Sequence, residues 1–135
     1  YLMILGEYPY HARIIRIEDD HPTNGFAKWM GDSVGHWENE TLVIHTEKMR
    51  REQSFPPIFS TIHTQITERL SLGENDTILY EYTVTDPQLY LQSFTAQIPF
   101  TRMQNGQVIY EYACHEGNYS FVGSLSGARW EDAQN

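Results

Sequence analysis

The sequence predicts an all-β fold, an antiparallel barrel of about eight strands followed by a short C-terminal helix. Strand-like segments recur at short intervals, turn-forming residues separate them, and no helical periodicity lies between them. Short loops without intervening helices are typical of antiparallel pairing, and eight strands suffice to close a sheet around a core or one small ligand. A β-sandwich of two sheets is the alternative fold.

The expected strands follow a period-2 alternation of side chains. They lie at residues 2–7, 11–17, 33–37, 41–48, 62–70, 77–85, 91–101 and 108–114. Their connectors are rich in Gly, Asn, Asp and Pro, as in Gly73-Glu74-Asn75-Asp76, and Glu38-Asn39-Glu40 joins a clear hairpin. Residues 49–60 form a longer excursion. Residues 121–132 are expected to form the helix. This order of elements predicts a lipocalin-like barrel of up-and-down strands.

The length of 135 residues fits one β-barrel domain spanning residues 1–135. The chain starts inside an expected strand and has no initiator Met, so we expect a leader or a longer N-terminal part upstream. The location is left open, with a periplasmic or secreted one slightly favoured over a cytoplasmic one. The single cysteine, Cys114, allows no internal disulfide and leaves the redox compartment open.

Composition narrows the classes of partner. The formal net charge is −9, with Lys+Arg 9 against Asp+Glu 18, which argues against nucleic acid and anionic membrane surfaces as partners. No apolar run approaches the roughly 20 residues that span a bilayer. Nine Tyr, six Phe and three Trp supply aromatic side chains that either fill a core or line a binding cavity. The expected partner is a small-molecule ligand.

Several stretches share the motifs of one protein family. Residues 29–38 read W-M-G-D-S-V-G-H-W-E, and residues 111–119 read E-Y-A-C-H-E-G-N-Y. Residues 11–15 (H-A-R-I-I), 67–70 (T-E-R-L) and 126–129 (S-G-A-R) follow in the family's order. Over nearly its whole length the chain resembles a family of uncharacterised bacterial proteins frequent in soil and environmental sequences. No established activity goes with this family, so the resemblance implies no reaction.

Two positions depart from the family pattern. Asn39-Glu40 replaces the family's G-D turn, and His45 stands where the family tends to have an acid. The second departure weakens any mechanism that needs a carboxylate at that position. Members of the family are commonly longer at the N-terminus, which agrees with the abrupt start of this chain.

The first candidate for chemistry is the run Cys114-His115-Glu116, which combines a thiol, an imidazole and a carboxylate. Adjacent strand residues point to opposite faces of a sheet, so Cys114 and His115 are poorly placed to share a metal ion. The sequence has no Cys-x-x-Cys pair to support zinc. We therefore expect no metal and no cofactor, and a small buried side chain at Cys114 is the simpler interpretation.

The second candidate is a set of side chains expected to converge on one aromatic-lined cavity. The candidate catalytic residues are His115, Glu111 and Glu68. The candidate ligand-binding residues are His11, Arg13, Trp29 and Trp37. Glu68 shares its strand face with Ile62, Ile66 and Leu70, where a carboxylate is costly unless it is paired or used. An internal ion-pair network, or charges that face outward, is the alternative to catalysis.

These candidates leave three functions open. Binding of a small molecule in the barrel cavity is favoured, with Trp29 and Trp37 expected to be largely buried beside the glycine-rich residues 31–35. An enzyme, a lyase, isomerase or hydrolase, would use His115 with Glu68 or Glu111 for acid–base chemistry. A structural or assembly subunit would use an open edge strand, either in a homo-oligomer or with the missing N-terminal segment.

Overall fold

The computed structural model describes residues 1–7, 11–53, 59–110, 117 and 119–134. The strands are β1 (Leu2–Gly6), β2 (His11–Ile17), β3 (Asp32–Glu38), β4 (Thr41–Glu47), β5 (Gln65–Leu72), β6 (Thr77–Thr85) and β7 (Phe94–Thr101). The helices are the short 3-10 helix η1 (Arg51–Gln53) and α1 (Tyr119–Asp132). The chain divides into two compact units, of which the first comprises Tyr1–Leu5 with Ala12–Gln107 and the second Gly6–His11 with Val108–Asn135.

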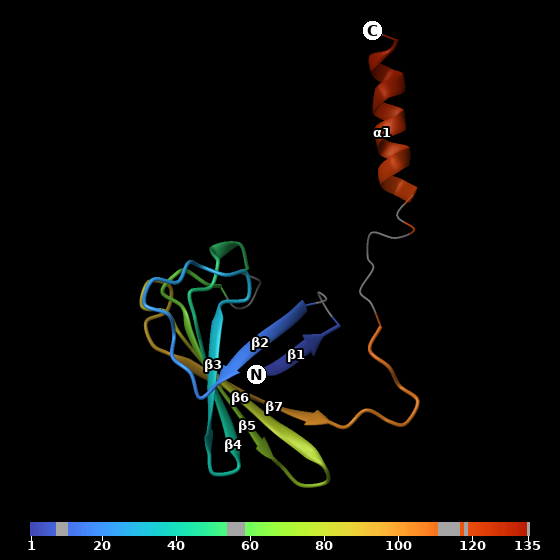
Figure 1. Cartoon of the computed structure of the whole chain (residues 1–135). Helices are drawn as coiled ribbons and strands as arrows, with labels where there is room; N and C mark the ends of the chain where they lie inside the picture. Colours follow the sequence, from blue (N-terminus) through green and yellow to red (C-terminus); the bar gives the residue numbers. More distant parts are fainter. Residues whose placement is uncertain (8–10, 54–58, 111–116, 118, 135) are drawn as a thin grey trace. The chain divides into compact units, whose positions relative to one another are not determined.

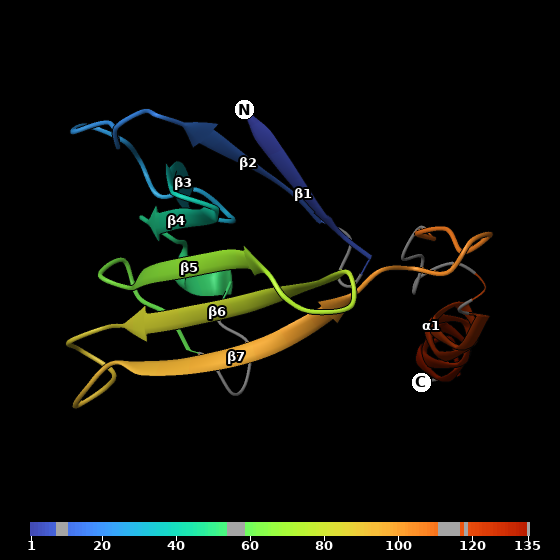
Figure 2. The same cartoon turned by 90° about the horizontal axis from the view of Figure 1, so that it is seen from below.

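The seven strands form one sheet in the order β1-β2-β3-β4-β5-β6-β7. Figures 1 and 2 show that this sheet is strongly curled, so that it makes a half-barrel. The predicted all-β, barrel-like fold with a C-terminal helix is confirmed, although the described sheet has seven strands rather than eight. Of the expected eighth strand, residues 108–110 are not in a strand and the remainder lies outside the described residues.

One strand pair contradicts the predicted antiparallel pairing. β2 runs parallel to β3, with Ile15 opposite Ser33 and Ile17 opposite Gly35. The long connector between these strands returns the chain to the starting end of β2 before β3 begins. Because the period-2 alternation is the same in both directions, the sequence pattern did not reveal it. The successive pairs from β3 to β7 are antiparallel as predicted.

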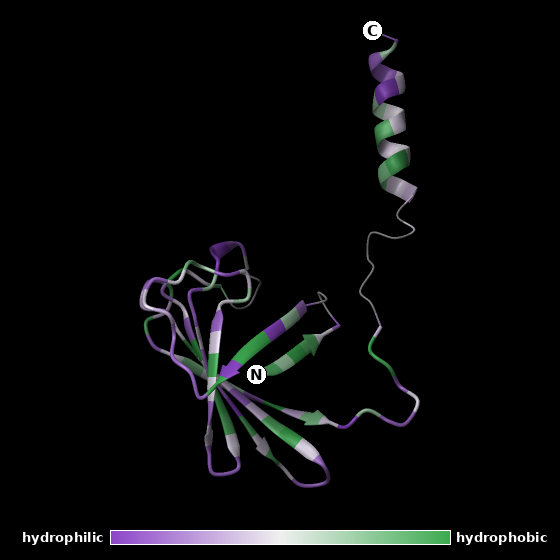
Figure 3. Cartoon of the chain, in the orientation of Figure 1, coloured by the Kyte–Doolittle hydropathy of each residue, from purple (hydrophilic) through white to green (hydrophobic). Residues whose placement is uncertain are grey.

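One face of the sheet carries the hydrophobic core. Ile15, Leu42 and Ile44 form the buried cluster, and Ile4, Ile17 and Leu70 pack against it. We call this side the core face. The cross-strand register extends it from Ile44 to Glu68, then to Tyr82 on β6. Figure 3 shows the mixture of hydrophobic and hydrophilic positions along the strands that this alternation produces.

The predicted burial of the two tryptophans is wrong. Trp29 is 54% exposed and Trp37 is 57% exposed. Trp37 lies on the core face near the end of β3, opposite Leu42 of the buried cluster, yet most of its own surface is exposed. Other side chains cover the two glycines of this stretch instead. A Cβ at Gly35 would lie 3.1 Å from both Ile15 and Ile17 of β2, and a Cβ at Gly31 would meet Thr46 of β4. A large aromatic side chain is thus not needed to brace this stretch.

The helix predicted at residues 121–132 is confirmed as α1. The side chains described along it are exposed within its own unit. Among the described residues, no helix combines the length and the apolar character that crossing a membrane requires.

Candidate functional site

Among the described strand residues, the buried carboxylate on the core face is that of Glu68. Glu68 lies in the middle of β5, opposite Ile44 on β4 and Tyr82 on β6, and only 2% of its surface is exposed. Alternation along β5 places it between Ile66 and Leu70 on the same face. A carboxylate in such apolar surroundings requires strong hydrogen-bond partners to remain ionised.

Two side chains from other strands supply those partners. Arg13 on β2 donates from Nη1 to Glu68 Oε2 at 2.6 Å and from Nη2 to Glu68 Oε1 at 2.8 Å. This two-point arrangement matches the planar guanidinium to the planar carboxylate. The Tyr80 hydroxyl on β6 donates to Glu68 Oε1 at 2.7 Å. We call Arg13, Glu68 and Tyr80 the core triad.

The surroundings of the core triad hold its outer members in their protonated forms. Burial raises the pKa of the Tyr80 hydroxyl, and the neighbouring Glu68 carboxylate raises it further. Burial lowers the pKa of Arg13, but its hydrogen bonds and attraction to Glu68 outweigh this effect, so the pKa is raised overall. A tyrosine and an arginine shifted in this direction are poor proton acceptors near neutral pH. The core triad is therefore suited to holding strands together rather than to moving protons.

An apolar groove of about 480 Å³ opens on the core face next to the core triad. Two of its lining residues are same-face neighbours of the core triad: Leu70 lies two residues from Glu68 on β5, and Ile78 lies two residues from Tyr80 on β6. Its described lining residues come from β1, β3, β4, β5, β6 and the turn after β3. They are Leu2, Ile4, Trp37, Glu40, Leu42, Leu70, Ser71, Leu72 and Ile78. The groove has the hydrophobic lining and the size of small-molecule sites.

Aromatic rings continue the core face beyond the groove. The rings of Tyr80 and Phe100 are stacked, with centroids 5.0 Å apart and planes 15° apart. The ring of Tyr82 lies 5.7 Å from that of Tyr80. These contacts fix the ring of Tyr80 on one side while its hydroxyl is fixed by Glu68.

The structure brings together three of the residues predicted to share a site. Glu68 and Arg13 are directly paired, and Trp37 lines the adjacent groove. Trp29 does not line that groove. His11 belongs to the second unit, where its Nδ1 is buried without a hydrogen-bond partner among the described residues. Glu111, Cys114 and His115 lie outside the described residues, so their predicted convergence with Glu68 stays a prediction.

Sequence reasoning missed a second buried carboxylate, Asp32, at the start of β3. Its oxygens accept hydrogen bonds from Arg16 at 2.9 and 3.0 Å, from His21 Nδ1 at 2.8 Å, and from Lys28. The hydrogen bonds from Arg16 do most to hold the pKa of Asp32 well below its usual range. These partners come from β2 and the connector that follows it, so Asp32 anchors the parallel crossover. Arg16 on β2, with His21 and Lys28 in that connector, was the available signal.

A third buried carboxylate, Asp86, is also structural. It accepts hydrogen bonds from the hydroxyl of Thr61 at 2.7 Å, the hydroxyl of Thr64 at 2.5 Å and the backbone N–H of Gln88 at 2.9 Å. Burial raises the pKa of Asp86, but these hydrogen bonds outweigh it and the pKa is lowered overall. Asp86 thereby ties the segment before β5 to the turn after β6.

Within the described ranges, no three His, Cys, Asp or Glu side chains gather in a group that could hold a metal ion. The chain matches no protein-family model, no curated protein and no solved structure. The geometry of the core face is therefore the basis for inferring function.

Proposed function

We propose that the groove on the core face binds a small, predominantly apolar molecule. The observation that carries this proposal is the lining itself. Its apolar members are Leu2, Ile4, Trp37, Leu42, Leu70, Leu72 and Ile78. A volume of about 480 Å³ lies within the range of roughly 300–1,000 Å³ that ligand sites occupy.

The exposed apolar area in the groove supports a binding role. Trp37 and Ile78 are 57% and 40% exposed, although both lie on the same face as the buried cluster. Covering such area with a ligand stabilises the complex by about 25 cal/mol for each Å² of apolar surface removed from water. Contiguous exposed apolar surface on a sheet face is typical of a site that receives a ligand or a partner.

The core triad supports the same proposal by making the groove rigid before a ligand arrives. It links β2, β5 and β6 through three short hydrogen bonds beside Leu70. A preformed site loses less conformational entropy on binding than one that must be ordered by its ligand. Catalysis by Glu68 receives less support, because all three hydrogen bonds to its oxygens come from groups that the site keeps protonated.

Two variants with matched substitutions test the proposal. Ile78 lines the groove, whereas Ile98 on β7 lies on the same face with 43% of its surface exposed and does not line it. The neutral fluorescent probe N-phenyl-1-naphthylamine should bind the parent protein. Ile78→Ser should weaken that binding by about tenfold, as expected for losing about 1.4 kcal/mol of apolar contact, and Ile98→Ser should leave it nearly unchanged.

The result that would overturn the proposal is absence of probe binding by the folded parent protein. Equal weakening by Ile78→Ser and Ile98→Ser would also overturn it, because the probe would then be bound elsewhere on the core face. Far-UV circular dichroism of each variant checks that the sheet is intact before the titrations are compared.

A further inference from the structure

We infer that the groove selects an amphipathic cation, a molecule with an apolar body and a positively charged ammonium group. This inference rests on the proposed function and adds the charge class of the ligand. The juxtaposition that carries it is Glu40 beside Trp37 in the lining of an otherwise apolar groove.

Glu40 is the one ionisable side chain among the described residues that line the groove. It lies in the two-residue turn between β3 and β4, where Asn39 takes a positive φ of 54° and Glu38 pairs with Thr41. The ion pairs described at this turn engage Glu38, and among the described residues no hydrogen bond or ion pair engages the Glu40 side chain. A ligand with a positive charge would therefore meet a free carboxylate at this end of the groove.

Trp37 supplies the second element that recognises a cation. Its side chain is exposed and lies on the core face, opposite Leu42 in the register of β3 and β4. The face of an indole ring attracts ammonium groups more strongly than the other aromatic side chains do. An exposed indole and a free carboxylate in one groove thus favour an ammonium group over an uncharged or anionic one.

The described guanidinium groups at this end of the sheet and beside the groove are already paired. Arg69 donates to Glu38 at 2.8 Å, and Arg102 binds Asp76 with two hydrogen bonds. The Arg13 guanidinium is occupied by Glu68. No guanidinium or ammonium group among the described lining residues is left to receive an anion.

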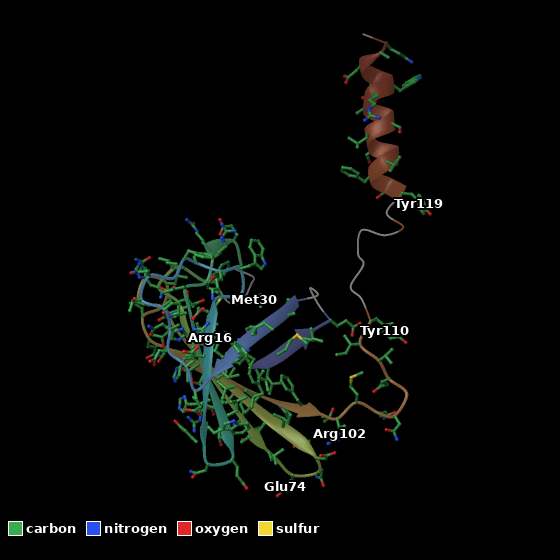
Figure 4. All side chains as sticks on the ribbon, in the orientation of Figure 1. Arg16, Met30, Glu74, Arg102, Tyr110 and Tyr119 are labelled. Carbon is green, nitrogen blue, oxygen red and sulfur yellow. The ribbon has the colours of Figure 1, made fainter. Side chains whose placement is uncertain are left out.

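Further negative charge surrounds the same end of the sheet. The turn between β5 and β6 carries Glu74 and, because β3 to β6 pair antiparallel, lies at the same end as the turn with Glu40. Figure 4 shows Glu74 at the tip of this turn. The whole chain has a formal charge of −9. Such a field raises the local concentration of cations and lowers that of anions.

Displacement of N-phenyl-1-naphthylamine by three ligands with the same ten-carbon chain tests the inference. The ligands are decyltrimethylammonium, 1-decanol and decanoate, each below its aggregation concentration. The parent protein should bind the ammonium about fivefold more tightly than the alcohol, and decanoate most weakly. Added salt should reduce the preference for the ammonium.

Matched variants then assign the preference to the groove. Glu40→Gln should remove most of the preference for the ammonium over the alcohol while the alcohol binds as in the parent. Trp37→Leu should reduce the same preference while keeping an apolar lining. Glu81→Gln is the control, because Glu81 lies on β6 with its side chain on the face opposite Tyr80 and Tyr82. That variant should retain the preference of the parent.

Equal affinity of the parent for the ammonium and the alcohol would overturn the inference and leave the proposed function standing. A preference that Glu40→Gln and Glu81→Gln reduce equally would overturn it too, because the effect would then come from net charge alone. If neither the probe nor any of the three ligands binds, the proposed function and this inference both fail.

Discussion

The core triad leads to a prediction about the free energy of unfolding. Removing one member of the Arg13–Glu68 ion pair should cost more stability than removing both. Arg13→Met should leave the Glu68 carboxylate, 2% exposed, with the Tyr80 hydroxyl as its hydrogen-bond donor. Removing one partner of a buried ion pair typically costs about 3–5 kcal/mol, because the other charge stays buried without compensation. Glu68→Met should cost a similar amount, since it leaves the guanidinium of Arg13 unpaired beside the apolar core.

The double variant Arg13→Met with Glu68→Met should be more stable than either single variant. Replacing both charges by apolar side chains of similar length removes the desolvation cost of each and leaves the Tyr80 hydroxyl without its acceptor. An unsatisfied buried hydroxyl costs about 1–3 kcal/mol, so the double variant should lose about that much. The coupling energy between the two positions should therefore be at least about 3 kcal/mol.

Urea denaturation at pH 7, followed by far-UV circular dichroism, measures these free energies of unfolding. The dependence of each free energy on urea concentration must be the same in all four proteins for the comparison to hold. Tyr80→Phe serves as an independent measure of the single hydrogen bond at 2.7 Å and should cost about 1.5–3 kcal/mol. If the two Met substitutions are additive, the ion pair contributes nothing and the reasoning is refuted.

Three further predictions concern the same free energy of unfolding. Asp32→Asn should be destabilised at pH 7, and its deficit should shrink as the pH falls below about 5. Hydrogen bonds from Arg16 keep the folded-state pKa of Asp32 below its ordinary value of 3.8. The parent therefore loses the stabilisation by the ionised Asp32 as the pH falls from about 5 toward that lowered pKa. A deficit that stays constant down to pH 3 would contradict this. Gly31→Ala should cost about 2 kcal/mol, and Gly106→Ala about 1 kcal/mol or less. Both glycines have a positive φ, but only at Gly31 would the new methyl group meet atoms of β4, the nearest at 2.6 Å. Equal losses would rule out this contact. Trp37→Ala should cost at most about 1–2 kcal/mol rather than the roughly 3–5 kcal/mol of a buried aromatic, since most of the Trp37 surface is already in water. A larger loss would show that Trp37 is covered in solution.

Local patterns were enough to predict most of the sheet. The alternation placed strands at residues 11–17 and 77–85, which are the bounds of β2 and β6 in the structure. Turn-forming residues located the antiparallel hairpins because a short turn fixes both the direction and the register of its strands. The connector from β2 to β3 is long, so it fixes neither the direction nor the register of these strands. The sequence pattern therefore did not reveal that they pair in parallel.

The candidate site was predictable only in part, because its partners are far apart in the sequence. Alternation put Glu68 on an apolar face, and the cost of burying a carboxylate then required a partner such as Arg13. The choice of Tyr80 depends on the register of β5 with β6, which sequence alternation alone does not give. Trp37 is exposed although it lies opposite the buried Leu42, so position in the alternation alone does not give its burial.

The pairing of Glu68 within the core triad lowers the cost of binding a ligand in the adjacent groove. Glu68 accepts three hydrogen bonds, so its charge needs no water from the adjacent groove. A ligand that expels water from the groove therefore leaves no buried carboxylate unpaired, and the full apolar contribution of the lining is available for binding. The charge that discriminates between ligands is placed at Glu40 instead, which stays exposed and so has little desolvation cost when a cation approaches. Affinity from the apolar lining and selectivity from a charged side chain at the rim are thereby assigned to different residues. Ile78→Ser should consequently weaken binding of the cation, the alcohol and the anion alike, whereas Glu40→Gln should mainly weaken binding of the cation.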